Sequence, residues 1–546
     1  MRKIIIVGGV AAGASTATRL RRLDENAQII MFERGEHISF ANCGLPYYIS
    51  GTIPERSDLL IQTPENMGKR FNLDIRVLSE VREILKDEKK VRVTNLSTGE
   101  SYLESYDYLV LCPGAKPYVP EIPGIDMENV FKVRNIPDSD IIKDYIKSEK
   151  VKKATILGGG FIGMEMLDTL VDLEIHTILI EAGSQVVNGL DLEMSKIIHN
   201  YLGLRNVELI LNDKAIALEG DRQAEEVILA SGETIPTELV ILGAGVKPEV
   251  WLAEEAGLTI GTTGGIWVDD NLKTSDPYIY AAGDAVQIKD FVTGADTLVP
   301  MAGPANRQGW IIANNIAGRD IKYKGSQCTG ILKVLGLTVA YTGKNEKDLR
   351  RLGIDYLACH LHPSSHATYY PGSTEMTLKL LFTPDEGRVL GAQIVGYDGV
   401  DKRIDVLATC IRAGLNVFDI QELELAYAPP FSSAKDPVNM AAYVAGNMLN
   451  GDVSVVHWTD VPNLVARGAH IIDVRDGEQT EEGRVPGAQY IHLDELRSRI
   501  DEIPKDKEIL VYCRAGQRSY IANRILLQNG FKVKNISGGY KSYSNL

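Results

Sequence analysis

The chain has 546 residues, of which 44% are hydrophobic and 24% are charged, and its formal net charge is −15. This length predicts three or four domains, and the composition is typical of globular proteins rather than of disordered or fibrous ones. The negative charge disfavours nonspecific binding to nucleic acid and to anionic membranes, so we expect neither as a partner.

Six cysteines are scattered along the chain, without a disulfide framework or a CxxC metal pair. No apolar stretch approaches the roughly 18 to 20 residues that a membrane helix needs. The apolar run at residues 4–7 is too short for a signal peptide and predicts a first β-strand. These features favour a cytoplasmic location, where a reducing environment keeps thiols free.

The first dinucleotide-binding pattern begins at the N-terminus. The strand at residues 4–7 leads into the loop GGVAAG (8–13), a helix to about Leu23, and a strand at 29–32 that ends in Glu33. Glycines let the backbone approach a pyrophosphate, the helix N-terminus offers free N–H groups, and the acidic residue accepts ribose hydroxyls. Because Val10 replaces the middle glycine of GxGxxG, this motif alone also suits an ordinary strand-turn-helix corner.

A second pattern is complete. The strand at 155–157 leads into GGGFIG (158–163), and a strand at 177–180 ends in Glu181. No arginine stands beside Glu181, which favours a free ribose 2′-hydroxyl, so NADH is expected in preference to NADPH.

A third motif, TSDPYIYAAGD (274–284), predicts a turn, a short strand and a glycine that exposes the carboxylate of Asp284. In this order, the three motifs resemble the FAD-dependent pyridine nucleotide-disulfide reductases over residues 1 to about 445. The resemblance implies that FAD is held by Gly8, Gly13, Glu33 and Asp284, and NAD(H) by Gly158, Gly160, Gly163 and Glu181.

The implied fold class is α/β, with two Rossmann-like domains, an α+β dimerisation domain and a separate C-terminal α/β domain. The small and polar residues at 447–455 predict a linker before that last domain. The expected boundaries are 1–150 and 245–323 for FAD binding, 151–244 for NAD(P)H binding, 324–446 for the interface of a homodimer, and 456–546 for the C-terminal domain.

Cys43 lies in the motif SFANCGLPY (39–47), which the resemblance places beside the flavin ring. Dithiol members of the family carry CxxxxC here, but Cys43 has no second cysteine within reach in sequence. A lone thiol cannot close an internal disulfide, so its oxidised form is a mixed disulfide, a persulfide or a sulfenic acid. The alternative for any single cysteine is that it only packs as a small apolar side chain.

Single-cysteine members divide mainly into coenzyme A-disulfide or persulfide reductases and NADH peroxidases or oxidases. The peroxide enzymes carry a histidine in the first glycine loop, and this loop has none. Arg19 and Arg22 lie one helical turn apart, a spacing that suits a phosphate or diphosphate, although Arg19, Arg21 and Arg22 also suit a solvated basic face. The motif and these arginines resemble the coenzyme A-disulfide reductase subfamily. This implies a coenzyme A site of Ser15, Arg19, Arg22, Ser39 and Asn42, with Lys69 or Arg70 and Asn306 or Arg307 as weaker candidates.

HATYYPG (366–372) and AYAPPFSSAKD (426–436) match interface motifs of that subfamily, whose tyrosines enter the active site of the partner subunit. A phenol can protonate a leaving thiolate, since its pKa is near that of a thiol. Tyr427 is the first candidate, and Tyr369 is favoured over Tyr370 without a clear separation; packing at the interface is the alternative. Lys435 of the second motif is a further substrate-binding candidate. No metal is expected at His360, His362 and His366, because neither a cysteine nor a carboxylate stands at ligand spacing.

Near the C-terminus, IIDVRD (471–476) and GRVPGAQYI (483–491) are very similar to the rhodanese signature, with Arg484 in place of the usual histidine. A buried strand at 509–512 then leads into CRAGQRS (513–519). Loop N–H groups at a helix N-terminus create a positive field that favours a thiolate at Cys513, and Arg518 completes the loop.

The sequence therefore predicts an NAD(P)H-dependent flavoprotein reductase of coenzyme A disulfide, coenzyme A persulfide or polysulfide through Cys43, with sulfurtransferase activity at Cys513. The fusion of both parts favours persulfide or polysulfide as substrate. The alternatives are an NADH peroxidase or oxidase that forms a Cys43 sulfenic acid, and a redox sensor with a docking rhodanese module. Delivery of sulfur from Cys513 to Cys43 within one chain, across a dimer or by diffusion stays open.

Overall fold

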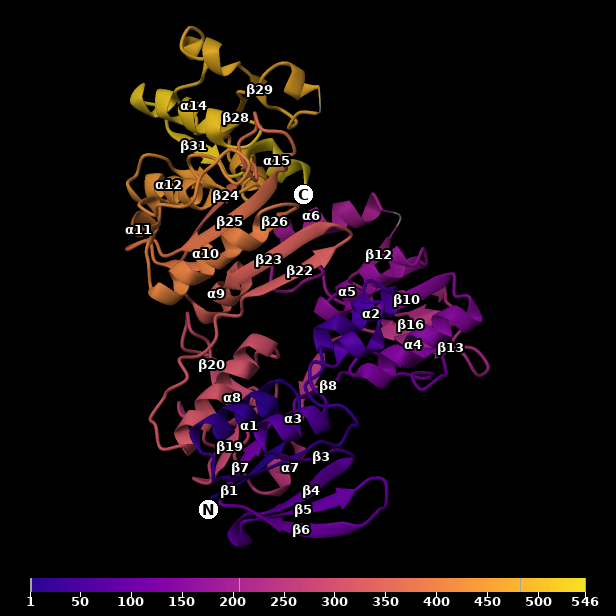
Figure 1. The fold of residues 1–546 in the computed structure, drawn as a ribbon. Coiled ribbons are helices and arrows are strands. Elements are labelled where there is room, and N and C mark those ends of the chain that lie inside the picture. Colours follow the sequence, from indigo (N-terminus) through magenta and orange to yellow (C-terminus); the bar gives the residue numbers. More distant parts are fainter. Residues whose placement is uncertain (1, 206, 482, 546) are drawn as a thin grey trace. The chain divides into compact units, whose positions relative to one another are not determined.

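The computed structural model describes residues 2–205, 207–481 and 483–545 (Figure 1). The chain divides into two compact units, each assembled from two separate stretches. The first comprises Met1–Gly183 and Val207–Ser326, and the second comprises Ser184–Asn206 and Gln327–Leu546. Among the described residues, no helix has the length and apolar character required to cross a bilayer.

A five-stranded parallel sheet forms the first half of unit one, in the order β19-β7-β1-β2-β3. Its central strand is almost fully buried, with Ile4, Ile5 and Ile6 at most 1% exposed, as expected for a strand covered on both faces. Helices α1 and α8 pack together so closely that a side chain at Gly309 would lie 2.4 Å from the Ala12 carbonyl oxygen. The elements are β1 (Lys3–Val7), α1 (Ala11–Leu23), β2 (Gln28–Phe32), β3 (Asp74–Arg76), β7 (Tyr108–Leu111), β19 (Ile279–Ala281) and α8 (Ala302–Ile316).

A second parallel sheet repeats the pattern in the order β12-β11-β10-β16-β9. As the sequence predicts, a strand, a glycine turn, a helix and a strand follow one another. The elements are β9 (Val130–Lys132), α4 (Ile136–Glu149), β10 (Lys153–Leu157), α5 (Phe161–Asp172), β11 (His176–Glu181), β12 (Glu208–Leu211) and β16 (Leu239–Leu242).

Shorter elements complete unit one. Three antiparallel strands, β4-β5-β6, form one small sheet, and β13-β14-β15 form another. The remaining elements that concern the site are α2 (Leu45–Ser50), α3 (Pro64–Phe71), β4 (Ser79–Leu85), β5 (Lys90–Asn95), β6 (Ser101–Ser105), β13 (Ala215–Glu219), β14 (Glu226–Leu229), β15 (Thr234–Pro236) and α7 (Trp251–Glu255).

Unit two contains an antiparallel sheet in the order β22-β23-β26-β25-β24. The elements are α6 (Leu192–Gly203), β22 (Gly330–Val334), β23 (Leu337–Gly343), α9 (Glu346–Leu352), β24 (Leu357–Leu361), β25 (Met376–Phe382), β26 (Val389–Gly396), α10 (Val400–Ala413), α11 (Val417–Gln421) and α12 (Pro437–Leu449).

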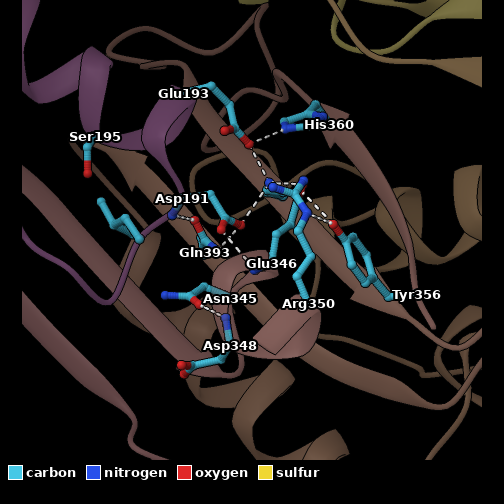
Figure 2. A network of polar contacts seen from close by, with 12 residues as sticks. Asp191, Glu193, Ser195, Asn345, Glu346, Asp348, Arg350, Tyr356, His360 and Gln393 are labelled. Carbon is cyan, nitrogen blue, oxygen red and sulfur yellow. Dashed lines mark hydrogen bonds and ion pairs between the residues drawn. The ribbon is translucent and has the colours of Figure 1, made fainter. Parts of the chain in front are cut away.

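A buried ionic cluster anchors the 184–206 stretch to this sheet (Figure 2). Lys379 of β25 is 0% exposed, and its ammonium nitrogen lies 2.7 Å from Asp191, 2.5 Å from Glu346 and in ion-pair contact with Glu193. These three carboxylates have the spacing of a cation site, and the lysine supplies the positive charge at their centre. The carboxylates raise the pKa of Lys379 against the opposing effect of burial, so the amine stays charged.

The C-terminal part of unit two holds a parallel sheet in the order β27-β31-β30-β28-β29. The connection before it is shorter than the predicted linker at 447–455. Helix α12 continues through Leu449, whose side chain packs beside Gly387, and Val455 already belongs to β27, so tertiary contacts override a polar composition. The elements are β27 (Val455–Val456), α13 (Val461–Ala466), β28 (His470–Asp473), β29 (Gln489–Tyr490), β30 (Ile509–Tyr512), α14 (Gln517–Gln528), β31 (Val533–Ile536) and α15 (Gly539–Ser544).

Candidate active site

A cavity of about 440 Å³ opens at the carboxyl ends of β1 and β2 in unit one. This is where open parallel sheets bind nucleotides. Four predicted FAD residues and one predicted coenzyme A residue line it, namely Gly8, Gly13, Glu33, Asp284 and Asn42.

The glycine loops of the two sheets are built alike. A side chain at Gly13 would lie 1.9 Å from the Gly8 carbonyl oxygen, and one at Gly163 would lie 1.9 Å from that of Gly158. Gly8 and Gly158 also have φ angles of +99° and +109°, which favour glycine. Only glycine therefore lets each helix start this close to its strand.

The acidic residues at the strand ends are also equivalent. Glu33 accepts hydrogen bonds from the N–H groups of Gly9 and Gly35, each at 2.8 Å. Glu181 accepts bonds from Gly159 at 2.7 Å and Gly183 at 2.8 Å. Each carboxylate is thus fixed at the mouth of its glycine loop and keeps lone pairs for further donors.

Asp284 follows Gly283, which has a φ of +88° at the end of β19. Burial raises the pKa of this carboxyl group, and the Arg134 guanidinium, 4.0 Å away, opposes that shift. Arg134 also lines the cavity. The sequence gives no signal for it, because it stands alone between β9 and α4.

Cys43 lies in a single 3₁₀ turn, Asn42–Gly44, directly before α2, and the residue as a whole is exposed. All six cysteines are free thiols. Partial burial raises the pKa of the Cys43 thiol, and the charges of Glu165 and Asp284 add to this effect. The neighbouring Asn42 has a buried Oδ1 atom without a hydrogen-bond partner among the described residues.

Glu165 is a site residue that the sequence reasoning missed. It lies on α5, and the Thr169 hydroxyl of the same helix donates to the Pro46 carbonyl in α2 at 3.0 Å, which holds α5 against the Cys43 segment. Burial, and then the charge of Asp168, raises the pKa of Glu165 to about 7. The sequence feature that could have identified Glu165 is its position two residues after the complete glycine motif.

The predicted coenzyme A residues of unit one fall into two groups. Ser15 donates to Asn306 Oδ1 at 2.5 Å, and Arg19 donates to Asn314 at 3.1 Å while stacking over Trp310. This group therefore joins α1 to α8. In the second group, the N–H of Ser39 donates to the Gly9 carbonyl, and Arg22 donates to the Thr18 carbonyl of its own helix. Arg70 on α3 and Arg307 on α8 are exposed.

The structure contradicts, for Arg21, the alternative in which all three arginines lie on a solvated basic face. It is 5% exposed and donates to five backbone carbonyl groups, which join the end of α1 to the end of α3. Only Arg19 and Arg22 of the three arginines remain available to a ligand.

In unit two, the hydroxyl groups of Tyr369 and Tyr427 are hydrogen-bonded at 3.0 Å, and both side chains are exposed. Tyr370 instead packs edge-on against His366. The buried Arg403 holds the two tyrosine loops together, because it donates to the Ser365 carbonyl at 2.8 Å and pairs with Asp436 at 3.0 Å. Lys435 is exposed beside this pair and lies over the ring of Tyr443.

Cys513 lies at the end of β30, and it is 2% exposed. The Gly516 N–H donates to its sulfur at 3.1 Å, and the Ser519 hydroxyl lies 3.5 Å away, so the loop bends around Sγ as predicted. Arg518 forms an ion pair with Asp476 and donates to Gln479. These contacts fix the far end of the loop.

Comparison with known proteins agrees with this geometry. The family model described as pyridine nucleotide-disulphide oxidoreductase matches residues 2–309, its dimerisation domain matches 331–437, and a rhodanese-like domain matches 458–546. The chain belongs to the pyridine nucleotide-disulphide oxidoreductase family. It is therefore an oxidoreductase that carries a dimerisation domain and a C-terminal rhodanese-like domain.

Among its relatives, the coenzyme A disulfide reductase of Staphylococcus aureus is 35% identical over 82% of this chain and 100% of its own. The reduced Bacillus anthracis CoADR-RHD structure is 52% identical, with a TM-score of 0.98 over 100% of this chain and 98% of its own. A NAD-dependent persulfide reductase from A. fulgidus is 36% identical, with a TM-score of 0.93 over 99% and 100%.

The residues present fit the two cofactors that this family uses. A nucleotide needs a glycine turn without side chains, free N–H groups at a helix start and a carboxylate for the ribose, and both sheets provide all three. Glu33 and Asp284 border the cavity suited to FAD, and Glu181 ends the strand suited to NAD(H). Val10, which replaces the middle glycine of GxGxxG, is the N-cap residue of α1 and lines this cavity without closing it.

Proposed function

We propose that this protein reduces coenzyme A disulfide, coenzyme A persulfide or polysulfide with NAD(P)H through Cys43, and transfers sulfane sulfur at Cys513. The observation that carries the first part is a free thiol beside the FAD-type cavity with no cysteine partner. The relatives named for coenzyme A disulfide and persulfide support the substrate class.

In this proposal, the Cys43 thiolate attacks one sulfur of the substrate. A bond forms between Cys43 Sγ and that sulfur, and the substrate S–S bond breaks, so the other half leaves as a thiolate or hydrosulfide. Bound FAD and NAD(P)H supply the two electrons that return Cys43 to its reduced form. Glu33, Asp284, Glu181 and the glycines at 8, 13, 158, 160 and 163 hold these cofactors.

Tyr427 and Tyr369 act as one unit in this scheme. One phenol donates its proton to the leaving sulfur, and the other donates a hydrogen bond to the oxygen of that phenol, which orients it. Since both phenols are exposed on the dimerisation domain, we propose that they serve Cys43 of the second subunit in a homodimer. We also propose that Lys435, exposed in the same segment as Tyr427 (426–436), contacts this substrate.

Coenzyme A is proposed to bind along α1. Its diphosphate contacts Arg19 and Arg22, with help from Arg70 or Arg307. Ser15, Ser39, Asn42 and Asn306 provide polar contacts closer to the thiol end. Ser39 and Asn42 lie next to Cys43 in the sequence, and Ser15 on α1 is hydrogen-bonded to Asn306 on α8. Six free thiols suit the reducing cytoplasm in which we place the enzyme.

At Cys513, the thiolate attacks the outer sulfur of a sulfane donor, the donor S–S bond breaks, and a Cys513 persulfide forms. The Gly516 N–H on Sγ stabilises both anionic forms. A sulfenic acid enzyme of the peroxidase type is disfavoured, because no histidine lies in the first glycine loop. A sensor with an inactive module is disfavoured, because Cys513 and its loop are intact.

Two variants separate the activities. Cys43→Ser should abolish NADH oxidation by coenzyme A persulfide and keep FAD bound, and Cys513→Ser should remove thiosulfate sulfurtransfer and spare that reduction. Cys410→Ser, which alters a buried thiol outside both sites, is the matched control. Reduction that survives in Cys43→Ser, or NADH oxidation by peroxide in the absence of any sulfane donor, would exclude this function.

A further inference from the structure

The segment 537–541 holds the back of the Cys513 loop. The N–H groups of Tyr540 and Lys541, at the start of α15, donate to the carbonyl oxygens of Cys513 at 2.7 Å and Arg514 at 3.0 Å. Gly539 has a φ of +59°, and a side chain there would lie 2.5 Å from the Cys513 carbonyl oxygen. The position of the catalytic loop therefore depends on this segment.

The dimerisation domain holds the other side of the same segment. His360 contacts the Ser537 hydroxyl through its N–H and its Nδ1, each at 3.1 Å. In Figure 2 its Nε2 side faces Glu193 of the buried cluster, at 3.1 Å. His362 places Nε2 3.0 Å from the Gly538 carbonyl oxygen and Nδ1 3.0 Å from the Thr377 hydroxyl.

A neutral His362 satisfies both of these contacts. Its Nε2–H donates to the carbonyl, which can only accept, and Nδ1 accepts from the hydroxyl. Burial, together with the positive charges of Lys541 and Arg514, lowers the pKa of His362 to about 3. This junction therefore keeps its geometry at neutral pH without a charge on the imidazole.

Glu375, one residue before β25, adds a charged contact. Its carboxylate forms an ion pair with Lys541 and lies 3.8 Å from the Arg514 guanidinium. Lys541 and Arg514 are the two residues whose backbones pair directly behind Cys513. A single side chain of the dimerisation domain thus contacts both the Cys513 loop, at Arg514, and helix α15, at Lys541.

We propose that Glu375 is a positioning residue for the sulfurtransferase site, acting from the reductase part of the chain. Through Lys541 and Arg514 it keeps the Cys513 and Arg514 carbonyls on α15, and this keeps the Gly516 N–H on Cys513 Sγ. Glu375 touches neither the sulfur nor the donor. The inference rests on the proposed sulfur transfer at Cys513.

The reaction explains why this position matters. The Cys513 thiolate attacks the outer sulfur of thiosulfate, the S–S bond of thiosulfate breaks, and sulfite leaves with the electron pair. The Cys513 persulfide then carries the negative charge next to Gly516. A loop that drifts by a fraction of an ångström weakens this N–H contact in both anionic states, so kcat falls more than KM rises.

The test compares Glu375→Ala, Glu375→Asp and the charge-exchanged pair Glu375→Lys with Lys541→Glu in the full-length protein loaded with FAD. Glu386→Ala, an exposed acidic residue of the same domain, is the matched control. Two readouts are taken: kcat and KM for thiosulfate with cyanide as acceptor, and the pH profile of Cys513 alkylation by iodoacetamide, resolved by peptide mass spectrometry.

In Glu375→Ala we expect kcat to fall about tenfold with little change in KM, as for one lost charge-assisted contact. The alkylation profile should move to higher pH, and both effects should be largely reversed by Glu375→Asp. The charge exchange restores the pair with residue 541 but places a lysine beside Arg514, so it should reverse both effects to a smaller extent. NADH-dependent reduction at Cys43 should match that of Glu386→Ala.

Wild-type values of kcat and of the alkylation profile in Glu375→Ala would overturn the proposal. Losses that follow a lower melting temperature, without a shifted profile, would also overturn it, since they indicate a purely structural role. If the wild-type protein transfers no sulfur at all, the proposed function of Cys513 fails. The alkylation profile then decides the role of Glu375 alone.

Discussion

Tyr369 and Tyr427 come from loops 58 positions apart, yet their hydroxyl oxygens lie 3.0 Å from one another. This hydrogen bond, more than partial desolvation, raises the pKa of Tyr369. Tyr370 is not a partner in this hydrogen bond, and its ring lies against His366. The contact supports our proposal of Tyr369 rather than Tyr370 as the residue that acts with Tyr427.

Removal of either phenol should slow the chemical step. We expect Tyr427→Phe to lower kcat for coenzyme A disulfide or persulfide by about 100-fold, the usual contribution of a positioned proton donor. Tyr369→Phe should have a smaller effect, because Tyr427 keeps its own hydroxyl. Steady-state NADH oxidation measures both, and an unchanged kcat in Tyr427→Phe would exclude proton donation. Tyr370→Phe is the control and should behave like the wild type.

Glu165 should make Cys43 less reactive above neutral pH. Its pKa of about 7 means that it is protonated at pH 6 and ionised at pH 8, where its charge raises the pKa of Cys43. Glu165→Gln should therefore speed Cys43 alkylation by iodoacetamide at pH 8 and leave it nearly unchanged at pH 6. Asp172→Asn, an exposed carboxyl group at the end of the same helix, controls for surface charge. Equal effects at both pH values would contradict this assignment.

The arginines of α1 should act on the nucleotide part of the substrate. Arg19→Ala should raise KM for coenzyme A persulfide about 10- to 100-fold, the value of a lost charge-assisted hydrogen bond. Glutathione persulfide, which has no phosphate, should show little change in KM. Arg222→Ala, on an exposed surface pair, serves as the control. A similar loss with both persulfides would argue against a phosphate contact.

Lys379 should be essential for the stability of unit two. Lys379→Met leaves Asp191, Glu193 and Glu346 without their shared counter-ion, and we expect destabilisation by about 3 to 5 kcal/mol. Thermal melting and urea titration measure this loss. Lys333→Met, an exposed lysine of β22, should change stability little. Adding Glu346→Gln to Lys379→Met should restore part of the loss; no recovery would mean that the charges are not coupled.

The sequence predicts those parts of the fold in which a local backbone constraint requires a particular residue type. Both glycine loops, the strand-end residues Glu33 and Glu181, and the short strand before Asp284 lie where the motifs indicate. In each case one backbone requirement, such as the close approach at Gly13, dictates the residue type. The Cys513 loop is predictable for the same reason.

Residues that act through distant partners gave no such signal. Lys379 lies within a run of apolar residues, and its three carboxylate partners come from residues 191, 193 and 346. Arg403 and Arg21 look like ordinary helix-surface residues in the sequence, yet both are buried and bind carbonyl groups of other segments. Helix or strand periodicity carries no information about such long-range pairs.

The division of the chain has a consequence for how this protein can be taken apart. Residues 184–206 leave the nucleotide-binding unit, join the second unit through Asp191 and Glu193, and then return. The backbone therefore passes between the units three times, near 183, 206 and 326. After a single proteolytic cut at 326, the two fragments stay associated, because residues 184–206 of the first fragment remain packed in the second unit. A truncated protein that ends at 326 contains α6 but lacks the sheet against which α6 packs.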